Sequence, residues 1–258
     1  MEIRAVKFRV GHEWRVGGLY LPSRAARSPA VLLLHGFPGI QKNDDVAAEL
    51  SRRGLTAFTP YFRGCWGSGG RFSLHGLLDD ARTALRLLSR YRHVDAGRVA
   101  VLGVSVGGWI ALKLAAETRL AAAAVMAPAL PRLDEPADAA YLRRNGKVVN
   151  IPDFGAVWRE YTDIARHERP DIYVRDIAPT PLLVMQGLQD RLVPPASARR
   201  LWALAGWPKE LLELRDEGHE FETDRPAVVS AVCDWLQERL ASRPAAEFPE
   251  LVDVGGGD

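Results

Sequence analysis

Short, continuous apolar runs recur along this chain, and between them the apolar residues repeat at helical spacing. Such runs are typical of strands that are buried on both faces of a sheet. The runs occupy residues 30–34, 55–59, 99–102, 121–126, 181–187 and 211–214. The helical spacing predicts helices over residues 43–53, 77–91, 109–116, 154–164, 196–205 and 226–240.

The alternation of strands with helices predicts an α/β fold, a mostly parallel central sheet with helices on both faces. Residues 3–10 and 14–21 alternate apolar and polar side chains instead. That alternation favours an antiparallel hairpin at one edge of the sheet. We expect a single domain over residues 1–243, with its reactive groups at the carboxyl ends of the strands.

Residues 131–179 interrupt the alternation. Five prolines and many charged residues fall where the pattern requires the next strand, and one amphipathic helix is predicted there. This insertion is long enough to cover the mouth of a site as a short cap. A surface excursion without function is the other interpretation, and the sequence does not decide between them. Residues 244–258 are rich in Pro, Glu and Gly, which predicts a disordered tail.

A Gly-x-Ser-x-Gly motif spans residues 103–107 and follows the apolar run that ends at Leu102. A strand that turns into a helix within a few residues requires very small neighbours, because the two backbones nearly touch there. Gly103 and Gly107 provide that space on either side of Ser105. We expect Ser105 to stand on this sharp turn with an exposed hydroxyl and to act as a nucleophile. A chance serine in a glycine-rich turn is the alternative.

A serine hydroxyl needs a base, and the chain has six histidines. His219 follows the last predicted strand, which places it at the same edge of the sheet as Ser105. His35 also follows a strand but precedes a Gly-Phe-Pro-Gly turn, so we expect it to brace that loop. The other four histidines are predicted to be structural or at the surface.

An imidazole base needs an acceptor that orients it and stabilises its charged form. Asp190 follows the predicted strand 181–187 directly and is our candidate. Asp134, after the preceding strand, is a weaker one. Glu217 and Glu220 flank His219 in sequence, and neighbours this close rarely reach the correct ring nitrogen.

The oxyanion that develops on acyl transfer needs two N–H donors aimed at one point. The backbone N–H of Val106, at the start of the helix after Ser105, is the first candidate. The second is expected from residues 35–39, and Phe37 is preferred because Pro38 has no N–H.

Composition excludes several other classes of function. The formal net charge is +2, and no basic cluster suggests a nucleic-acid partner. The two cysteines lie far apart without a metal-ligand spacing, so we expect free thiols and no metal or cofactor. The chain has no signal-peptide pattern and no membrane-length apolar run, which predicts a cytoplasmic protein without a membrane partner. A homodimer is compatible with the sequence.

Three motifs, in this order, resemble those of the α/β-hydrolase superfamily over residues 31–240: His-Gly-Phe-Pro-Gly, Gly-Val-Ser-Val-Gly, and Gly-Leu-Gln-Asp followed by Gly-His. Within the superfamily the chain is similar to small bacterial carboxylesterases of the cinnamoyl and feruloyl type. That likeness includes a loop over residues 63–70, in which Ser68 is not expected to be a nucleophile. Phe62 departs from the pattern, since many relatives have Asp there.

The resemblance implies a serine esterase that acts on short acyl or aryl esters through an acyl-enzyme on Ser105. Trp66, Trp158 and Tyr161 are candidates to line its substrate pocket, together with Trp109, for which core packing is the alternative. A small serine peptidase or amidase, and a slow-turnover binding protein that retains the triad, remain the alternative functions. A lipase is disfavoured because residues 131–179 are rich in Arg, Asp and Glu.

Overall fold

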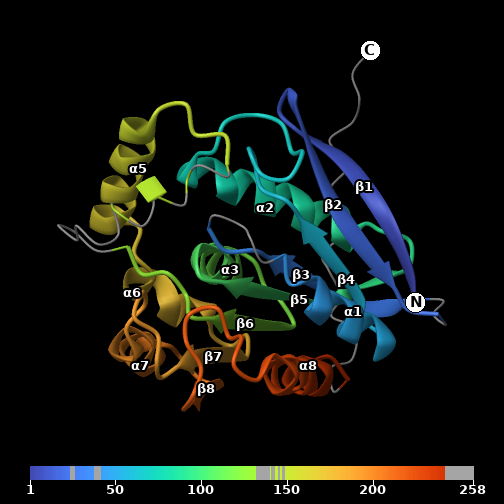
Figure 1. The fold of residues 1–258 in the computed structure, drawn as a ribbon. Coiled ribbons are helices and arrows are strands. Elements are labelled where there is room, and N and C mark those ends of the chain that lie inside the picture. Colours follow the sequence, from blue (N-terminus) through green and yellow to red (C-terminus); the bar gives the residue numbers. More distant parts are fainter. Residues whose placement is uncertain are drawn as a thin grey trace.

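The computed structural model describes residues 1–23, 27–37, 42–131, 140, 143–144, 146 and 149–241. Within these residues, eight strands form a single sheet in the order β1-β2-β4-β3-β5-β6-β7-β8 (Figure 1). The strands are β1 (Glu2–Val10), β2 (Glu13–Leu21), β3 (Ser28–Leu34), β4 (Thr56–Pro60), β5 (Val94–Val104), β6 (Ala122–Met126), β7 (Leu182–Gly187) and β8 (Lys209–Leu214). Each predicted strand is present, and β5 extends further at both ends than its apolar run.

The sheet is mostly parallel, as the alternating pattern predicts. β1 pairs antiparallel with β2, and β2 pairs antiparallel with β4, whereas β4, β3, β5, β6, β7 and β8 are parallel to one another. The predicted hairpin is therefore confirmed as one edge of the sheet. The carboxyl ends of the parallel strands lie along one side, where the loops that follow them converge.

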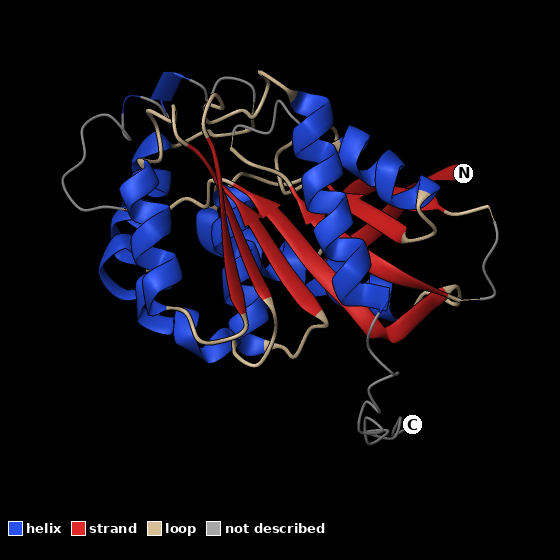
Figure 2. Cartoon of the chain, turned by 90° about the horizontal axis from the view of Figure 1, so that it is seen from below, coloured by secondary structure: helices blue, strands red, loops and turns tan. Residues whose placement is uncertain are grey.

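Helices cover both faces of the sheet (Figure 2). One face carries α2 (Leu74–Ser89), α3 (Val106–Glu117) and α7 (Pro195–Leu204), and the other carries α1 (Asp44–Arg52) and α8 (Arg225–Ala241). α2 begins earlier than the predicted residue 77, because the Ser73 hydroxyl accepts a hydrogen bond from the Gly76 N–H at 3.1 Å. This side-chain cap satisfies a donor that the first helical turn leaves unpaired.

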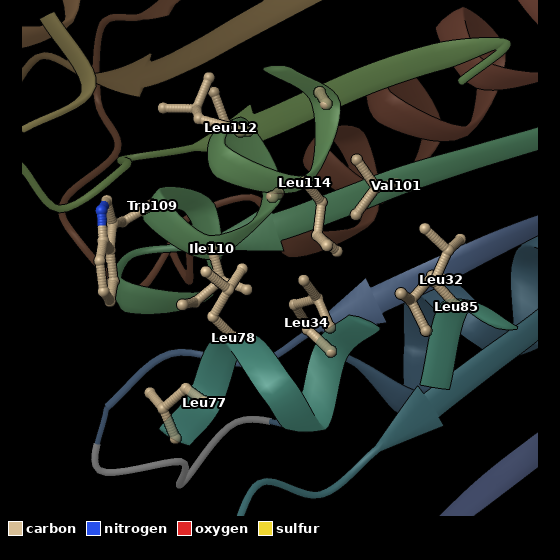
Figure 3. Packing of buried hydrophobic residues seen from close by; sticks show 14 of the residues in the cluster. Leu32, Leu34, Leu77, Leu78, Leu85, Val101, Trp109, Ile110, Leu112 and Leu114 are labelled. Atoms are coloured by element: carbon tan, nitrogen blue, oxygen red, sulfur yellow. The ribbon is translucent and has the colours of Figure 1, made fainter. Parts of the chain in front are cut away.

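Successive residues of the central strands enter different hydrophobic layers. Leu32 and Leu34 of β3 pack toward α2 and α3, as Figure 3 shows, whereas Val31 and Leu33 belong to the layer beneath α1 and α8. Because side chains of a strand alternate between faces, both sets must be apolar when both faces are covered. This double burial explains why the strands appear in the sequence as continuous apolar runs.

The second half of the insertion packs against the core. It forms α5 (Phe154–His167), α6 (Pro170–Tyr173) and the short helix η2 (Val174–Ile177). α6 and η2 pack on α3, and the Trp109 Nε1–H donates to the Glu168 carbonyl at 3.3 Å. Glu160 of α5 accepts hydrogen bonds from the Ser73 hydroxyl and the Leu74 N–H, at 3.0 and 2.6 Å. These contacts attach α5 to the start of α2 (Figure 1).

Two regions named by the sequence patterns lie outside the described residues. They are Asp134, with most of residues 132–148, and the predicted tail 244–258. Among the helices that are described, none combines the length and the apolar character needed to cross a bilayer.

Asp80 of α2 connects three segments of the chain through buried charges. Its carboxylate accepts from Arg15 Nε of β2 at 2.9 Å, and from Arg63 Nη2 and the Arg63 backbone N–H at 2.9 and 2.8 Å. The Arg15 and Asp80 side chains are each only 2% exposed. An ion pair at this depth is stable only while both partners are present, because either charge alone would be buried without compensation.

We predict that Asp80→Asn lowers the free energy of unfolding by about 3–5 kcal/mol, since it leaves Arg15 buried without a counter-charge. Urea denaturation measures this value. Asp79→Asn is the matched control, because the Asp79 side chain is 62% exposed and its ion pair with Arg82 lies at the surface. We expect Asp79→Asn to lower the free energy of unfolding by less than about 0.5 kcal/mol. Equal effects of the two substitutions would contradict the assignment.

Candidate active site

Ser105 stands at the sharp turn between β5 and α3, as the glycine spacing predicts. Its backbone has φ 53° and ψ −117°, a strained conformation for a residue with a side chain. A Cβ added to Gly103 would lie 2.1 Å from the Gly107 carbonyl oxygen, and one added to Gly107 would lie 2.2 Å from the Leu34 carbonyl oxygen. Neither position can hold a larger residue without moving the backbone.

The structure brings Ser105, His219 and Asp190 into one hydrogen-bonded chain. His219 Nε2 lies 3.1 Å from Ser105 Oγ, and His219 Nδ1 lies 2.8 Å from Asp190 Oδ2. The three residues come from the loops after β5, β7 and β8, all at the carboxyl edge of the sheet. This is the arrangement in which an imidazole accepts a proton from a hydroxyl while a carboxylate orients it.

The Asp190 carboxylate is held from several directions. Oδ1 accepts from the Leu192 and Val193 N–H groups, each at 2.8 Å, and Oδ2 also accepts from Gln186 Nε2 at 3.1 Å. Burial by itself raises the pKa of Asp190. The hydrogen bond and charge of His219, with the two backbone donors, outweigh burial and lower this pKa below its ordinary 3.8. Asp190 therefore stays negative at neutral pH.

One expectation for Ser105 is wrong. We expected an exposed hydroxyl at the turn, yet the residue is only 6% exposed. The reason is that neighbouring loops enclose the turn. The Ser105 carbonyl accepts from the N–H of Ala129, in the loop after β6, at 2.8 Å, and the backbone of Gly36 lies against the side chain.

The loop after β3 lies beside Ser105, where the second oxyanion donor is expected. A Cβ added to Gly36 would lie 3.3 Å from Ser105 Cβ and 4.0 Å from Ser105 Oγ. Phe37 is the next residue, and its buried ring packs edge-on against Phe72 with centroids 5.0 Å apart. Val106 is the first residue of α3, so its N–H has no acceptor within the helix. The roles of Phe37 and Val106 remain predictions.

An open cavity of about 560 Å³ borders His219. Its wall includes Ala140 and Arg144 of the insertion, Gln189 and Arg191 beside Asp190, and Glu220 beside His219. The insertion therefore forms part of the wall next to the candidate base. A cavity of this size accommodates a small organic molecule.

Comparison with known proteins agrees with this geometry. Residues 31–255 match the model of a family described as "Alpha/beta hydrolase family". The chain belongs to this family. This hydrolase is also 30% identical over 210 residues to the uncharacterized protein Rv2307c of Mycobacterium tuberculosis, an alignment that covers 80% of this chain and 68% of that protein.

Solved structures share the fold of this hydrolase. The alpha/beta hydrolase GrgF from Penicillium sp. sh18 superposes with a TM-score of 0.78 at 20% identity, over 93% of this chain and 100% of that one. Est1E from Butyrivibrio proteoclasticus with ferulic acid bound superposes with a TM-score of 0.76 at 20% identity, over 92% of this chain and 100% of that one. The expected α/β-hydrolase fold is thus confirmed.

The three aromatic residues proposed for a substrate pocket of the hydrolase are not among the described residues that line the cavity. Trp66 packs edge-on against His35, with centroids 4.6 Å apart. Trp158 and Tyr161 stack on each other along α5 at 4.9 Å, and Tyr161 is buried in the core. These contacts are all within the protein, and the binding roles of the three residues stay predictions.

The other polar candidates have structural partners. The Ser68 hydroxyl donates to the Tyr61 carbonyl at 2.7 Å and accepts from the Val16 N–H at 3.1 Å. Glu217 accepts from the N–H groups of Thr223 and Asp224, at 3.1 and 2.6 Å, so it shapes the loop that carries His219. Cys65 and Cys233 are buried free thiols, as expected.

Gln186 is a positioning residue that the sequence patterns did not indicate. Its amide nitrogen donates to Asp190 Oδ2, to the Gly187 carbonyl and to the Val193 carbonyl, each at 3.1 Å. The amide thus links both ends of the turn that presents Asp190. A signal was present, because Gln186 is the polar member of an otherwise apolar buried strand.

Among the described residues, one group could hold a metal ion. The ligand atoms of His75, Asp163 and Glu168 all lie within 4.8 Å of one another on the surface of α2 and α5. Glu168 also lies 3.6 Å from Lys113 Nζ, a competing cation. The group shares no residue with the candidate triad.

His35 braces its loop, as predicted. Its Nε2 accepts from the Phe62 N–H at 3.0 Å, which leaves Nδ1 to donate to the Gly36 carbonyl at 2.8 Å. Burial lowers the pKa of His35 from 6.5 to about 4, assisted by the charge of Lys42 and opposed by the Gly36 carbonyl. The folded protein therefore holds the neutral ring, which joins the loop after β3 to the loop after β4.

We predict that His35 makes this hydrolase acid-sensitive. In the unfolded chain His35 becomes protonated below pH 6.5, whereas in the folded chain it becomes protonated only below about pH 4. The contribution of neutral His35 to the free energy of unfolding is complete above pH 6.5, and it decreases by about 3 kcal/mol as the pH falls toward 4. Urea denaturation across this range should show a shallower pH slope for His35→Gln. His12→Gln, at an exposed turn, is the control and should keep the wild-type slope.

Proposed function

We propose that this protein is a serine hydrolase that cleaves carboxylic esters through an acyl-enzyme on Ser105. The observation that carries the proposal is the hydrogen-bonded chain from Asp190 through His219 to Ser105 Oγ, at 2.8 and 3.1 Å. Family membership supports the class of reaction, and the identity of the residue at the turn selects the chemistry. A serine there favours attack by an alkoxide on an acyl carbon.

In the proposed mechanism, Ser105 Oγ attacks the ester carbonyl while His219 Nε2 takes its proton. The resulting imidazolium faces the negative Asp190 carboxylate, which keeps the ring in the correct orientation. His219 then returns the proton to the departing alcohol. A water molecule, activated by His219 in the same way, releases the acid from Ser105.

The tetrahedral intermediate carries an oxyanion, for which we propose the backbone N–H groups of Val106 and Phe37 as donors. The close approach of Gly36 to Ser105 supports the second assignment, and the position of Val106 at the start of α3 supports the first. Helix N-termini favour negative charge, so α3 adds to the same effect.

We propose short acyl and aryl esters as the substrate class. The insertion over residues 131–179 is rich in Arg, Asp and Glu, which disfavours an apolar lid that would hold a long hydrocarbon chain. Est1E, a neighbour in fold, was solved with ferulic acid bound, which is consistent with an aromatic acyl group. A small amidase or peptidase remains the second candidate, since the same triad cleaves amides.

We predict that Ser105→Ala lowers kcat for p-nitrophenyl acetate by about 10⁴-fold or more, because it removes the attacking atom. The free energy of unfolding should change by only about 1 kcal/mol, through the loss of one hydrogen bond to His219. Ser68→Ala is the matched control, since this buried serine makes only structural contacts. Activity at the wild-type level in Ser105→Ala would place the nucleophile elsewhere.

Chain length provides a separate prediction. We expect a higher kcat/KM on p-nitrophenyl acetate and butyrate than on the dodecanoate, because the insertion over residues 131–179 is rich in Arg, Asp and Glu and offers little apolar surface to a long chain. Steady-state rates across the series measure the preference. A rate that rises on emulsified long-chain esters would indicate a lipase. Faster cleavage of a matched p-nitroanilide would indicate the amidase, and a single burst without turnover would indicate a binding protein.

A further inference from the structure

We propose that the cavity beside His219 binds a carboxylate on the leaving-alcohol part of the ester, through Arg144 and Arg191. The inference rests on the proposed function and extends it to a substrate class. Two arginines on one cavity wall, next to a candidate catalytic base, form a site that the triad itself does not need. Guanidinium groups are the side chains best suited to hold a carboxylate, because they offer paired N–H donors.

Both guanidinium groups are available for a ligand. Within the described part of the chain, neither Arg144 nor Arg191 has an ion pair or a side-chain hydrogen bond. Among the described surface arginines of this protein, some pair with a carboxylate, as Arg200 does with Asp171 at 3.1 Å, and others do not. What distinguishes Arg144 and Arg191 is that both line the cavity that borders His219.

The charge of the wall fits a single negative group. Arg144 and Arg191 contribute two positive charges, and Glu220 contributes one negative charge. The remaining charge of +1 complements a carboxylate better than a doubly charged phosphate.

Arg191 is held in place by the triad itself. It lies between Asp190 and Leu192, and the Asp190 carboxylate accepts from the Leu192 N–H at 2.8 Å. The turn that presents the acid therefore also fixes the backbone of the arginine. Arg144 comes from the insertion, so a ligand held by both would connect the insertion to the catalytic loop.

The chemistry of the reaction assigns the carboxylate to the alcohol rather than the acyl part. The departing oxygen must receive a proton from His219 Nε2, so the alcohol part lies against His219 in the tetrahedral intermediate. The cavity borders His219, whereas the candidate oxyanion donors are at the starts of α3 and of the loop after β3. A group attached to the leaving oxygen therefore extends toward Arg144 and Arg191.

A pair of phenolic acetates tests the proposal. 4-Acetoxybenzoate carries a carboxylate on its leaving group, and its methyl ester is the neutral partner with the same skeleton. We expect Arg144→Gln and Arg191→Gln each to lower the ratio of kcat/KM, charged over neutral, by about fivefold. Lysine at either position should restore part of the ratio. Added salt should reduce the ratio of the wild-type protein.

Arg143→Gln is the matched control. It removes the same charge from the neighbouring residue, but Arg143 is not among the cavity residues and its guanidinium lies 4.4 Å from the centroid of the Phe154 ring. We expect the ratio to be unchanged in this variant. A ratio that falls equally in Arg143→Gln and Arg144→Gln would reduce the effect to general surface charge and overturn the proposal.

The experiment separates the carboxylate site from the proposed function. If the neutral ester is hydrolysed and the ratio is insensitive to Arg144 and Arg191, the carboxylate proposal fails and the esterase stands. If neither ester is hydrolysed, the proposed function fails, and calorimetric titration with 4-hydroxybenzoate decides the site. Binding that is lost in Arg144→Gln and Arg191→Gln supports it, and binding that is absent or equal in all variants overturns it.

Discussion

The structure depends on one close approach, that of β5 to α3 at the turn around Ser105. No Cβ fits at Gly103 or Gly107, because the carbonyl oxygens of Gly107 and Leu34 lie within 2.1 and 2.2 Å of where it would be. The turn fixes Ser105 at φ 53°, a conformation that costs about 1–3 kcal/mol for a residue of this kind. The Ser105 N–H donates to the Met126 carbonyl at 2.9 Å, and the Ser105 carbonyl accepts from Trp109 and Ala129.

Those hydrogen bonds explain how the strain persists. They come from β6, from α3 and from the loop after β6, so three neighbouring segments determine the backbone of one residue. The remaining parts of the site are built on loops, which require other constraints. Gln186 and two backbone N–H groups hold Asp190, Glu217 shapes the loop of His219, and His35 joins the two loops beside Ser105. Each of these polar groups is buried, where a lost partner is costly.

Short-range patterns in the sequence were enough to predict much of the fold. Strand positions, the hairpin and the turn at Ser105 depend on burial on two faces and on the size of two glycines, and both are visible in the order of residues. The order Ser105, Asp190, His219 could also be predicted, because strand ends of a parallel sheet meet at one edge. The burial of Ser105 could not be predicted from the sequence, because it arises from Ala129 and Gly36, which approach Ser105 only in the folded chain.

Side chains that act across loops were the least predictable part. Gln186 occupies a strand position that an apolar residue could fill, and its role depends on three acceptors at 3.1 Å from residues later in the chain. Arg144 and Arg191 are separated by most of the insertion and by β7, so no local pattern relates them. Only the packing of the insertion, through Glu160 onto α2 and through α6 and η2 onto α3, relates its residues to the cavity.

That packing bears on how the insertion contributes to the site. The Glu160 carboxylate accepts from the Leu74 N–H at 2.6 Å, and the Glu168 carbonyl accepts from the Trp109 indole N–H, so the insertion is attached to the core at the middle of α5 and just past the C-terminal end of this helix. Helices α6 and η2 then cover α3, the helix that begins at the candidate nucleophile. Ala140 and Arg144 belong to the same insertion and line the cavity. The charge of Arg144 is therefore part of the cavity wall, where it can discriminate between substrates by their charge.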